Sequence, residues 1–170
     1  MGDSAGGGLI VSAISEMLSP SGIGDRRLPL PRAVALISPW ISLACDKPSY
    51  SANATKDMVL KQQYLLDSAK DYIGDAGLER ADPGKAPLAF FPPTVIVVGS
   101  TEILLDDSRD LYRRLRGIQE RVVMTVYEGE GHVWLLSNIA SEASQHALAE
   151  IKGFWERVRE GKRAQTFHGV

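Results

Sequence analysis

Residues 94–99 read TVIVVG, a short apolar run that is rich in valine and isoleucine. Two other runs have the same character, AVALIS at 33–38 and VVMTVY at 122–127. None of them alternates apolar with polar residues, which is typical of a strand that is covered on both faces. The sequence therefore predicts three buried parallel strands.

Helical patterns lie before, between and after these runs. We expect four helices, at residues 6–18, 59–72, 107–118 and 139–158. Pro20 and Gly22 are expected to end the first, and Asp107 is a candidate N-cap of the third. One face of the last helix is expected to hold Ile139, Ala143, Ala147, Ile151 and Trp155. Helices that alternate with strands predict an α/β fold with a parallel sheet.

Length and composition narrow the possible function. The chain has 170 residues, and we expect one domain over residues 1–160 and a disordered tail at 161–170. The net charge of -2 gives no basic field for nucleic acid, and no run of about 18 apolar residues predicts a membrane span. The start lacks the features of a signal peptide, and Cys45 is the only cysteine, so we expect a cytoplasmic protein.

Residues 2–6 read GDSAG, which matches the G-x-S-x-G turn between a strand and a helix. In this motif the serine, here Ser4, is a nucleophile at a helix N-terminus. Flanking glycines let the neighbouring backbone approach, and the N–H of Ala5 would face a forming oxyanion. The same letters also fit a glycine-rich turn in which Ser4 caps the helix. They fit a phosphate-binding loop less well, because no lysine follows the glycines.

Two further segments supply partners for Ser4. His132 lies in a glycine-rich loop directly after the third strand, at the sheet edge where the Ser4 turn is also expected. His146 lies within the last predicted helix, and His168 lies in the tail. Glu102 is the first carboxylate after the second strand and is our candidate acid, with Asp106 as the alternative.

The chain resembles the hormone-sensitive-lipase-type esterases of the α/β-hydrolases. The resemblance rests on GDSAGGGL at 2–9, SPW at 38–40, PPTVIVVGSTEILLDD at 92–107 and GHVW at 131–134, and it extends to about Val158. It implies hydrolysis of carboxylic esters, often of short to medium acyl chains, without a metal or cofactor. It also implies Ser4 as nucleophile, His132 as base and Glu102 as acid, although most relatives have aspartate at the last position.

The sequence departs from that family because nothing in it matches the family's upstream half, including a His-Gly-Gly-Gly loop that forms most of the oxyanion hole. We therefore expect an incomplete α/β-hydrolase fold of three parallel strands flanked by helices, marginal stability and impaired activity. A homo-oligomer, or association through the exposed sheet edge, is also expected. The apolar residues Met58, Leu60, Tyr64, Phe90 and Phe91 are assigned to the core, with a pocket wall as the alternative.

Two other functions stay open at this stage. A serine peptidase of the prolyl-oligopeptidase type shares the motif and the order serine, acid, histidine along the chain. A non-catalytic interaction module or gene fragment would keep the fold without the chemistry.

Overall fold

A computed structural model describes residues 1–19 and 28–161. Within these residues the strands form one parallel sheet in the order β1-β2-β3-β4. The strands are β1 Gly2–Asp3, β2 Val34–Ile37, β3 Thr94–Gly99 and β4 Val122–Tyr127. The helices are α1 Ser4–Leu18, α2 Pro48–Ala52, α3 Gln62–Ile73, α4 Leu78–Ala81, α5 Leu105–Arg116, α6 Trp134–Ser137 and α7 Glu142–Arg159. Two short 3₁₀ turns lie at Gly74–Ala76 and Pro83–Lys85.

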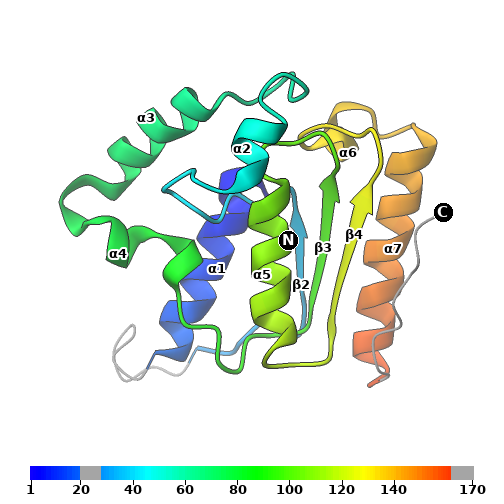
Figure 1. Ribbon diagram of the computed structural model, residues 1–170. Helices are drawn as coiled ribbons and strands as arrows, with labels where there is room; N and C mark the ends of the chain where they lie inside the picture. The colour runs from blue at the N-terminus through cyan, green and yellow to red at the C-terminus, as the bar shows by residue number, and fades with distance from the viewer. Residues whose placement is uncertain (20–27, 162–170) are drawn as a thin grey trace.

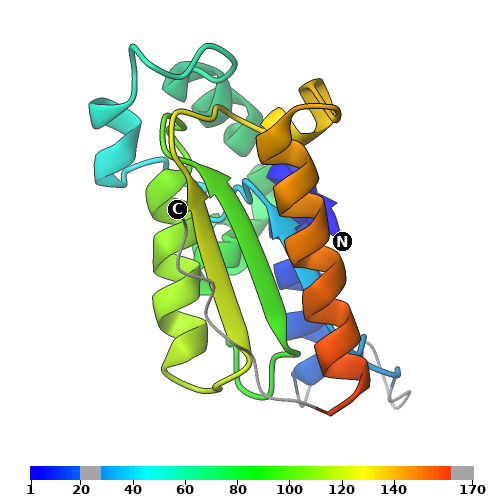
Figure 2. The same cartoon turned by 90° about the vertical axis from the view of Figure 1, so that its right-hand side faces the viewer.

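Helices cover both faces of the sheet, as the uninterrupted apolar strands require. Figure 2 shows α5 and α7 on opposite sides of β3 and β4. On the α7 side, alternate strand residues pack against Ala147, Ile151, Phe154 and Val158. On the other side, the intervening strand residues pack against Val11 and Ile14 of α1 and against Leu111 and Leu115 of α5.

All three predicted strands are present, but the expectation of three strands in the sheet is wrong. The sheet has one additional strand, β1, which has two residues and pairs in parallel with Leu36 and Ile37 of β2. A glycine and an aspartate form no apolar run, so no periodic pattern marks this strand. Its position places the Ser4 turn at the carboxyl end of the sheet, at the top of Figure 1.

The predicted helices are confirmed as elements, but several details differ. α1 begins at Ser4, two residues earlier than predicted, and ends at Leu18. α7 begins after Ser141, whose hydroxyl accepts the Ser144 N–H, so Ile139 lies outside the helix. The face of α7 that contacts the sheet includes Phe154 and Val158 rather than Trp155, which is 42% exposed. Pro20, Gly22 and residues 162–170 lie outside the described residues.

The five apolar residues assigned to the core divide into two groups. Leu60 and Phe91 are buried, as expected. Met58, Tyr64 and Phe90 are exposed, so their assignment to the core is wrong. Met58 and Phe90 lie in the connections between helices and strands, and Tyr64 lies on the outer face of α3. No strand or helix of the described residues packs over them.

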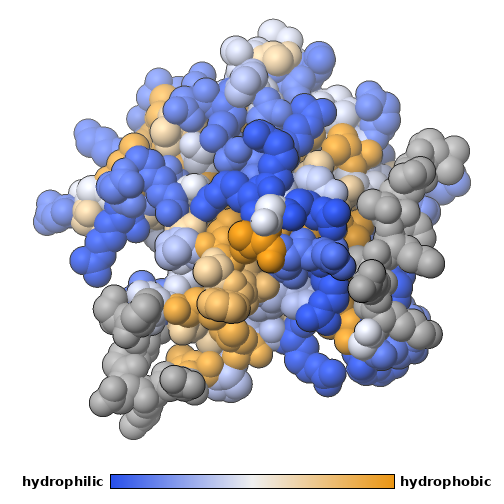
Figure 3. All heavy atoms as spheres, turned by 60° about the horizontal axis from the view of Figure 1, so that its bottom comes forward, coloured by the Kyte–Doolittle hydropathy of each residue, from blue (hydrophilic) through white to orange (hydrophobic). Residues whose placement is uncertain are grey.

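Apolar side chains also gather at the amino ends of the strands. Figure 3 shows this end of the molecule, at the bottom of Figure 1 and away from the Ser4 turn. Exposed apolar residues that precede β2, β3 and β4 are Leu28, Leu30, Phe90 and Ile118. Among the described helices, none combines the length and the apolar character needed to cross a membrane.

Candidate active site

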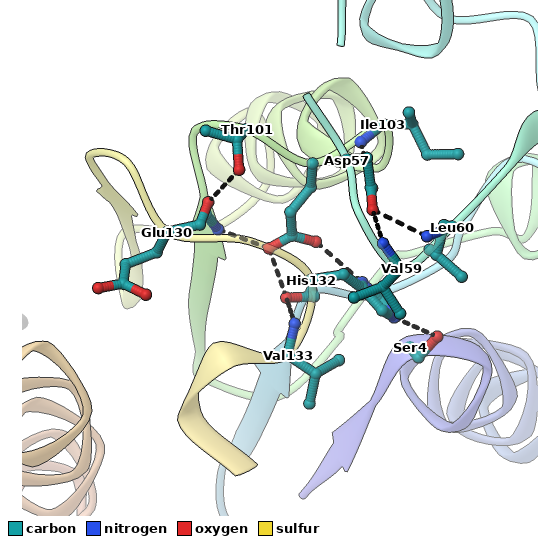
Figure 4. Close-up of polar contacts among 12 residues, drawn as sticks. Ser4, Asp57, Val59, Leu60, Thr101, Ile103, Glu130, His132 and Val133 are labelled. Carbon is teal, nitrogen blue, oxygen red and sulfur yellow. Dashed lines mark hydrogen bonds and ion pairs between the residues drawn. The ribbon is translucent and has the colours of Figure 1, made fainter. Parts of the chain in front are cut away.

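Ser4, Glu102 and His132 meet at the carboxyl ends of the strands. His132 Nε2 lies 3.0 Å from Ser4 Oγ, and its Nδ1 lies 3.0 Å from Glu102 Oε2. In Figure 4 the dashed line from Ser4 leads to the ring of His132. The three side chains therefore lie close together, as the sequence predicts. Their part in catalysis stays a prediction.

The hydrogen-bond partners determine which ring nitrogen carries the proton. A carboxylate only accepts hydrogen bonds, so His132 Nδ1 is the nitrogen that donates to Glu102. In a neutral imidazole the other nitrogen is then an acceptor, and the Ser4 hydroxyl donates to it. This arrangement suits removal of the serine proton by His132 Nε2.

Exposure increases along this chain of hydrogen bonds. Glu102 is 0% exposed, His132 is 7% exposed, and Ser4 is partly open to solvent. The acid is therefore shielded from water while the hydroxyl remains accessible. A buried carboxylate needs several donors, and Glu102 Oε1 accepts from Gly99 N–H at 2.6 Å and from the Ser38 hydroxyl at 2.7 Å.

The Ser4 turn has the strained backbone that the motif predicts. Ser4 has a φ of 49°, a left-handed conformation that costs a non-glycine residue about 1–2 kcal/mol. Gly2 permits the close approach of the Gly6 carbonyl, as expected, whereas a Cβ at Gly6 would meet no neighbour. Ala5 N–H lies in the first turn of α1, where helix N–H groups have no intrahelical partner.

Gly99 brings the loops of Glu102 and His132 together. A Cβ on Gly99 would collide with the carbonyl oxygen of Glu130, two residues before His132. The same oxygen accepts the N–H and the hydroxyl of Thr101. The close contact of these two loops sets the distance between the acid and the imidazole.

Two buried polar residues hold the loop that carries Glu102. Asn53 Nδ2 donates to the Ser100 and Glu102 carbonyls at 3.1 and 2.8 Å. Asp57 Oδ2 accepts from Ile103 N–H, and its Oδ1 accepts from the N–H groups of Val59 and Leu60, as Figure 4 shows. Sequence reasoning missed both, because their partners in the loop that carries Glu102 lie at least 46 residues away along the chain.

The other acidic candidates have different partners. Asp106 Oδ2 accepts from Ser49 N–H and its Oδ1 from Arg109, so its carboxylate points to α2 rather than to His132. The prediction that Asp107 caps the helix is wrong, because α5 begins at Leu105 after Leu104. Asp107 is buried and accepts from the N–H groups of Ile41 and Ser42 at 2.9 and 2.5 Å. Burial raises its pKa to about 7, although those two N–H groups act against the rise.

His146 lies in α7, as predicted, and contacts the Tyr127 hydroxyl rather than Ser4. The Tyr127 hydroxyl also donates to Glu150, and burial, followed by the negative charge of Glu150, raises the Tyr127 pKa. Within the described residues, no group of three or more His, Cys, Asp and Glu side chains is arranged to hold a metal ion.

An apolar hollow of about 180 Å³ adjoins Ala5. Leu9 of α1, Trp40 and Leu43 after β2, and Tyr72 of α3 line most of it. None of its lining residues belongs to the loop of His132. The hollow therefore lies beside the Ser4 turn and apart from the imidazole.

Comparisons with known proteins agree with this arrangement. An acetyl-hydrolase from Streptomyces hygroscopicus is 31% identical over 163 residues, which cover 95% of this chain and 52% of the relative. An esterase from Acinetobacter venetianus is 30% identical over 129 residues, covering 74% of this chain and 42% of the relative. The chain thus spans about half the length of the curated relatives it matches.

Solved structures show the same fold over the same span. An esterase from the bacterial hormone-sensitive lipase family matches with a TM-score of 0.80 and 31% identity, over 94% of this chain and 51% of that one. A hormone-sensitive lipase from a metagenome library also matches with a TM-score of 0.80, at 27% identity, over 92% of this chain and 53% of that one. The sequence model of a family described as alpha/beta hydrolase fold matches residues 1–136. On these grounds, this chain belongs to the alpha/beta hydrolase fold family.

Proposed function

We propose that this chain carries the reacting groups of a serine carboxylic ester hydrolase. The observation that supports the proposal most is the continuous chain of hydrogen bonds from Ser4 through His132 to Glu102. The names of the relatives, acetyl-hydrolase and esterase, support ester hydrolysis as the reaction class.

In the proposed reaction, Ser4 Oγ attacks the ester carbonyl carbon while His132 Nε2 accepts the hydroxyl proton. The Ala5 N–H, at the N-terminus of α1, donates to the oxyanion of the tetrahedral intermediate. His132 then gives the proton to the departing alcohol, which leaves an acyl group on Ser4. Water, activated by His132, releases the acid and restores Ser4.

The apolar hollow beside Ala5 suits the acyl part of the ester. The alcohol must leave next to His132, because that residue protonates it, so the acyl chain lies on the other side of Ser4. An engineered cavity of about 150 Å³ in another protein holds benzene. A hollow of about 180 Å³ therefore suits an acyl chain of up to about six carbons.

We expect slow turnover by residues 1–170 alone. The sequence contains no His-Gly-Gly run to add oxyanion donors to the Ala5 N–H. Removal of one such donor lowers turnover by roughly 10²–10³ in serine hydrolases. A reagent that reacts once with the serine is therefore a more sensitive assay than repeated turnover.

The test measures labelling by a fluorophosphonate, in which Ser4 Oγ bonds to phosphorus and fluoride leaves. We expect the parent chain to label, and the Ser4→Ala and His132→Ala variants to lose labelling. Ser15→Ala is the matched control. Ser15 is also a buried serine, but its hydroxyl donates to the Pro87 carbonyl and contacts neither Glu102 nor His132.

A parent chain that does not label, or a Ser4→Ala variant that labels equally well, would contradict the proposal and favour a non-catalytic module. With p-nitrophenyl butyrate and dipeptide amides offered together, hydrolysis of the amides alone would favour a peptidase instead.

A further inference from the structure

Ser38 connects the acid to the segment that follows the histidine. It is the first residue after β2 and is 0% exposed. Its hydroxyl donates to Glu102 Oε1 at 2.7 Å and accepts the Val133 N–H at 3.2 Å. One side chain thus contacts the carboxylate of Glu102 and the backbone next to His132.

These two contacts require a hydroxyl group. The carboxylate of Glu102 can only accept, and the Val133 N–H can only donate, whereas a serine hydroxyl does both. Alanine and glycine would leave the Val133 N–H without this acceptor. They would also leave Glu102 Oε1 with the Gly99 N–H as its remaining donor among the described residues.

The two donors on Glu102 Oε1 determine how the carboxylate is turned. With Gly99 N–H and the Ser38 hydroxyl on one oxygen, the second oxygen points to His132 Nδ1. Loss of the Ser38 donor leaves Gly99 N–H alone on Oε1, so rotation about the last bond of the Glu102 side chain is less restrained. Loss of the Val133 contact loosens the residue next to His132 at the same time.

The backbone at these positions is held in an unfavourable conformation. Ser4, Ser38 and Val133 have φ values of 49°, 46° and 53°, in the left-handed region that non-glycine residues avoid. Such conformations persist where surrounding contacts hold them, and they gather at functional sites. Glycine would adopt the backbone conformation of Ser38 more easily than serine does. What serine adds at this position is its hydroxyl group.

We propose that Ser38 is a positioning residue that aligns Glu102 with His132 through these two hydrogen bonds. This inference rests on the proposed function, because it assigns Ser38 a role in the reactivity of Ser4. Asn53 and Asp57 hold only the backbone of the neighbouring loop, so neither performs the same task.

The test compares Ser38→Ala, Ser38→Gly and the control Ser15→Ala in fluorophosphonate labelling at several probe concentrations. The free energy of a hydrogen bond to a charged group corresponds to a factor of about 10–100 in a rate or equilibrium constant. We expect both Ser38 variants to lower the maximal labelling rate by about that factor and to leave the half-saturating probe concentration unchanged. The control should label at the parent rate.

Glycine separates a positioning role from a structural one. It accepts the left-handed backbone of Ser38 without strain, so a purely structural role predicts that Ser38→Gly labels as fast as the parent. That result would overturn the inference. Ser38→Gly also keeps the test decisive if Ser38→Ala fails to fold.

A second measurement needs no reactivity. We expect a downfield proton resonance from His132 Nδ1–H in the parent chain that is lost in Glu102→Gln and shifted or broadened in Ser38→Gly. An unchanged resonance in Ser38→Gly would also overturn the inference. A parent chain that shows the resonance but does not label would contradict the proposed function instead.

Discussion

The buried carboxyl of Asp107 predicts an unusual dependence of stability on pH. Asp107 is fully buried, and its Oδ1 accepts from the backbone of Ile41 and Ser42. Its Oδ2 is buried, as is the hydroxyl of the neighbouring Tyr50. Burial raises the pKa of Asp107 from its ordinary value of 3.8 to about 7, so the folded protein favours the neutral carboxyl.

The raised pKa determines the sign of the effect. Between pH 3.8 and about 7 the folded chain holds a proton on Asp107 that the unfolded chain has lost. The contribution of Asp107 to the free energy of unfolding therefore decreases as the pH rises through this window. The difference in pKa corresponds to a loss on the order of 4 kcal/mol in total, of which roughly 3 kcal/mol falls between pH 5 and pH 8.

The variant Asp107→Asn isolates this contribution, because its amide stays neutral and keeps an oxygen for the two backbone N–H groups. We expect the stability of the variant relative to the parent to increase by roughly 3 kcal/mol between pH 5 and pH 8. Urea unfolding, followed by tryptophan fluorescence across that range, measures the difference. Asp75→Asn, at an exposed aspartate, is the control. Parallel curves for Asp107→Asn and the parent would refute the reasoning.

Three further predictions concern the site and the sheet. Glu102→Gln should lower fluorophosphonate labelling by about 10²–10⁴, while Asp106→Asn should label within a few-fold of the parent; the reverse order would make Asp106 the acid. Gly99→Ala should cost about 1–3 kcal/mol in urea unfolding, because its Cβ collides with the Glu130 carbonyl; an unchanged midpoint would show that the loops separate freely. Residues 1–170 should form oligomers in light scattering, because β1 pairs with only two residues of β2; a stable monomer at tens of micromolar would disagree.

Much of the fold follows from local patterns in the chain. The runs at 94–99 and 122–127 coincide with β3 and β4, and the run at 33–38 contains β2. Burial on both faces leaves a strand few polar positions, so these runs were recognisable from the sequence before any pairing partner was known. The two-residue β1 exists only through its pairing with β2, and no pattern in Gly2 or Asp3 could show it.

The candidate site was recognisable for a related reason. The G-x-S-x-G motif identifies Ser4, while Glu102 and His132 lie in the loops that follow β3 and β4, and the carboxyl ends of parallel strands meet at one edge of a sheet. Ser38 also follows a strand directly, and the same rule could have identified it. It was missed because a lone serine carries no recognisable motif, and its two partners lie 64 and 95 residues away.

The amino-acid sequence by itself determined the parallel α/β organisation, the Ser4 turn and the set of residues that could react. Apolar periodicity and short motifs depend on neighbours within a few positions, so they can be recognised in the amino-acid sequence. Only the tertiary structure decided that Glu102 rather than Asp106 faces His132, that Asp107 binds the backbone after β2, and that Ser38 joins two loops. These choices depend on which distant segments supply donors and acceptors, and that becomes defined only when the strands pair and the loops at their ends come into contact.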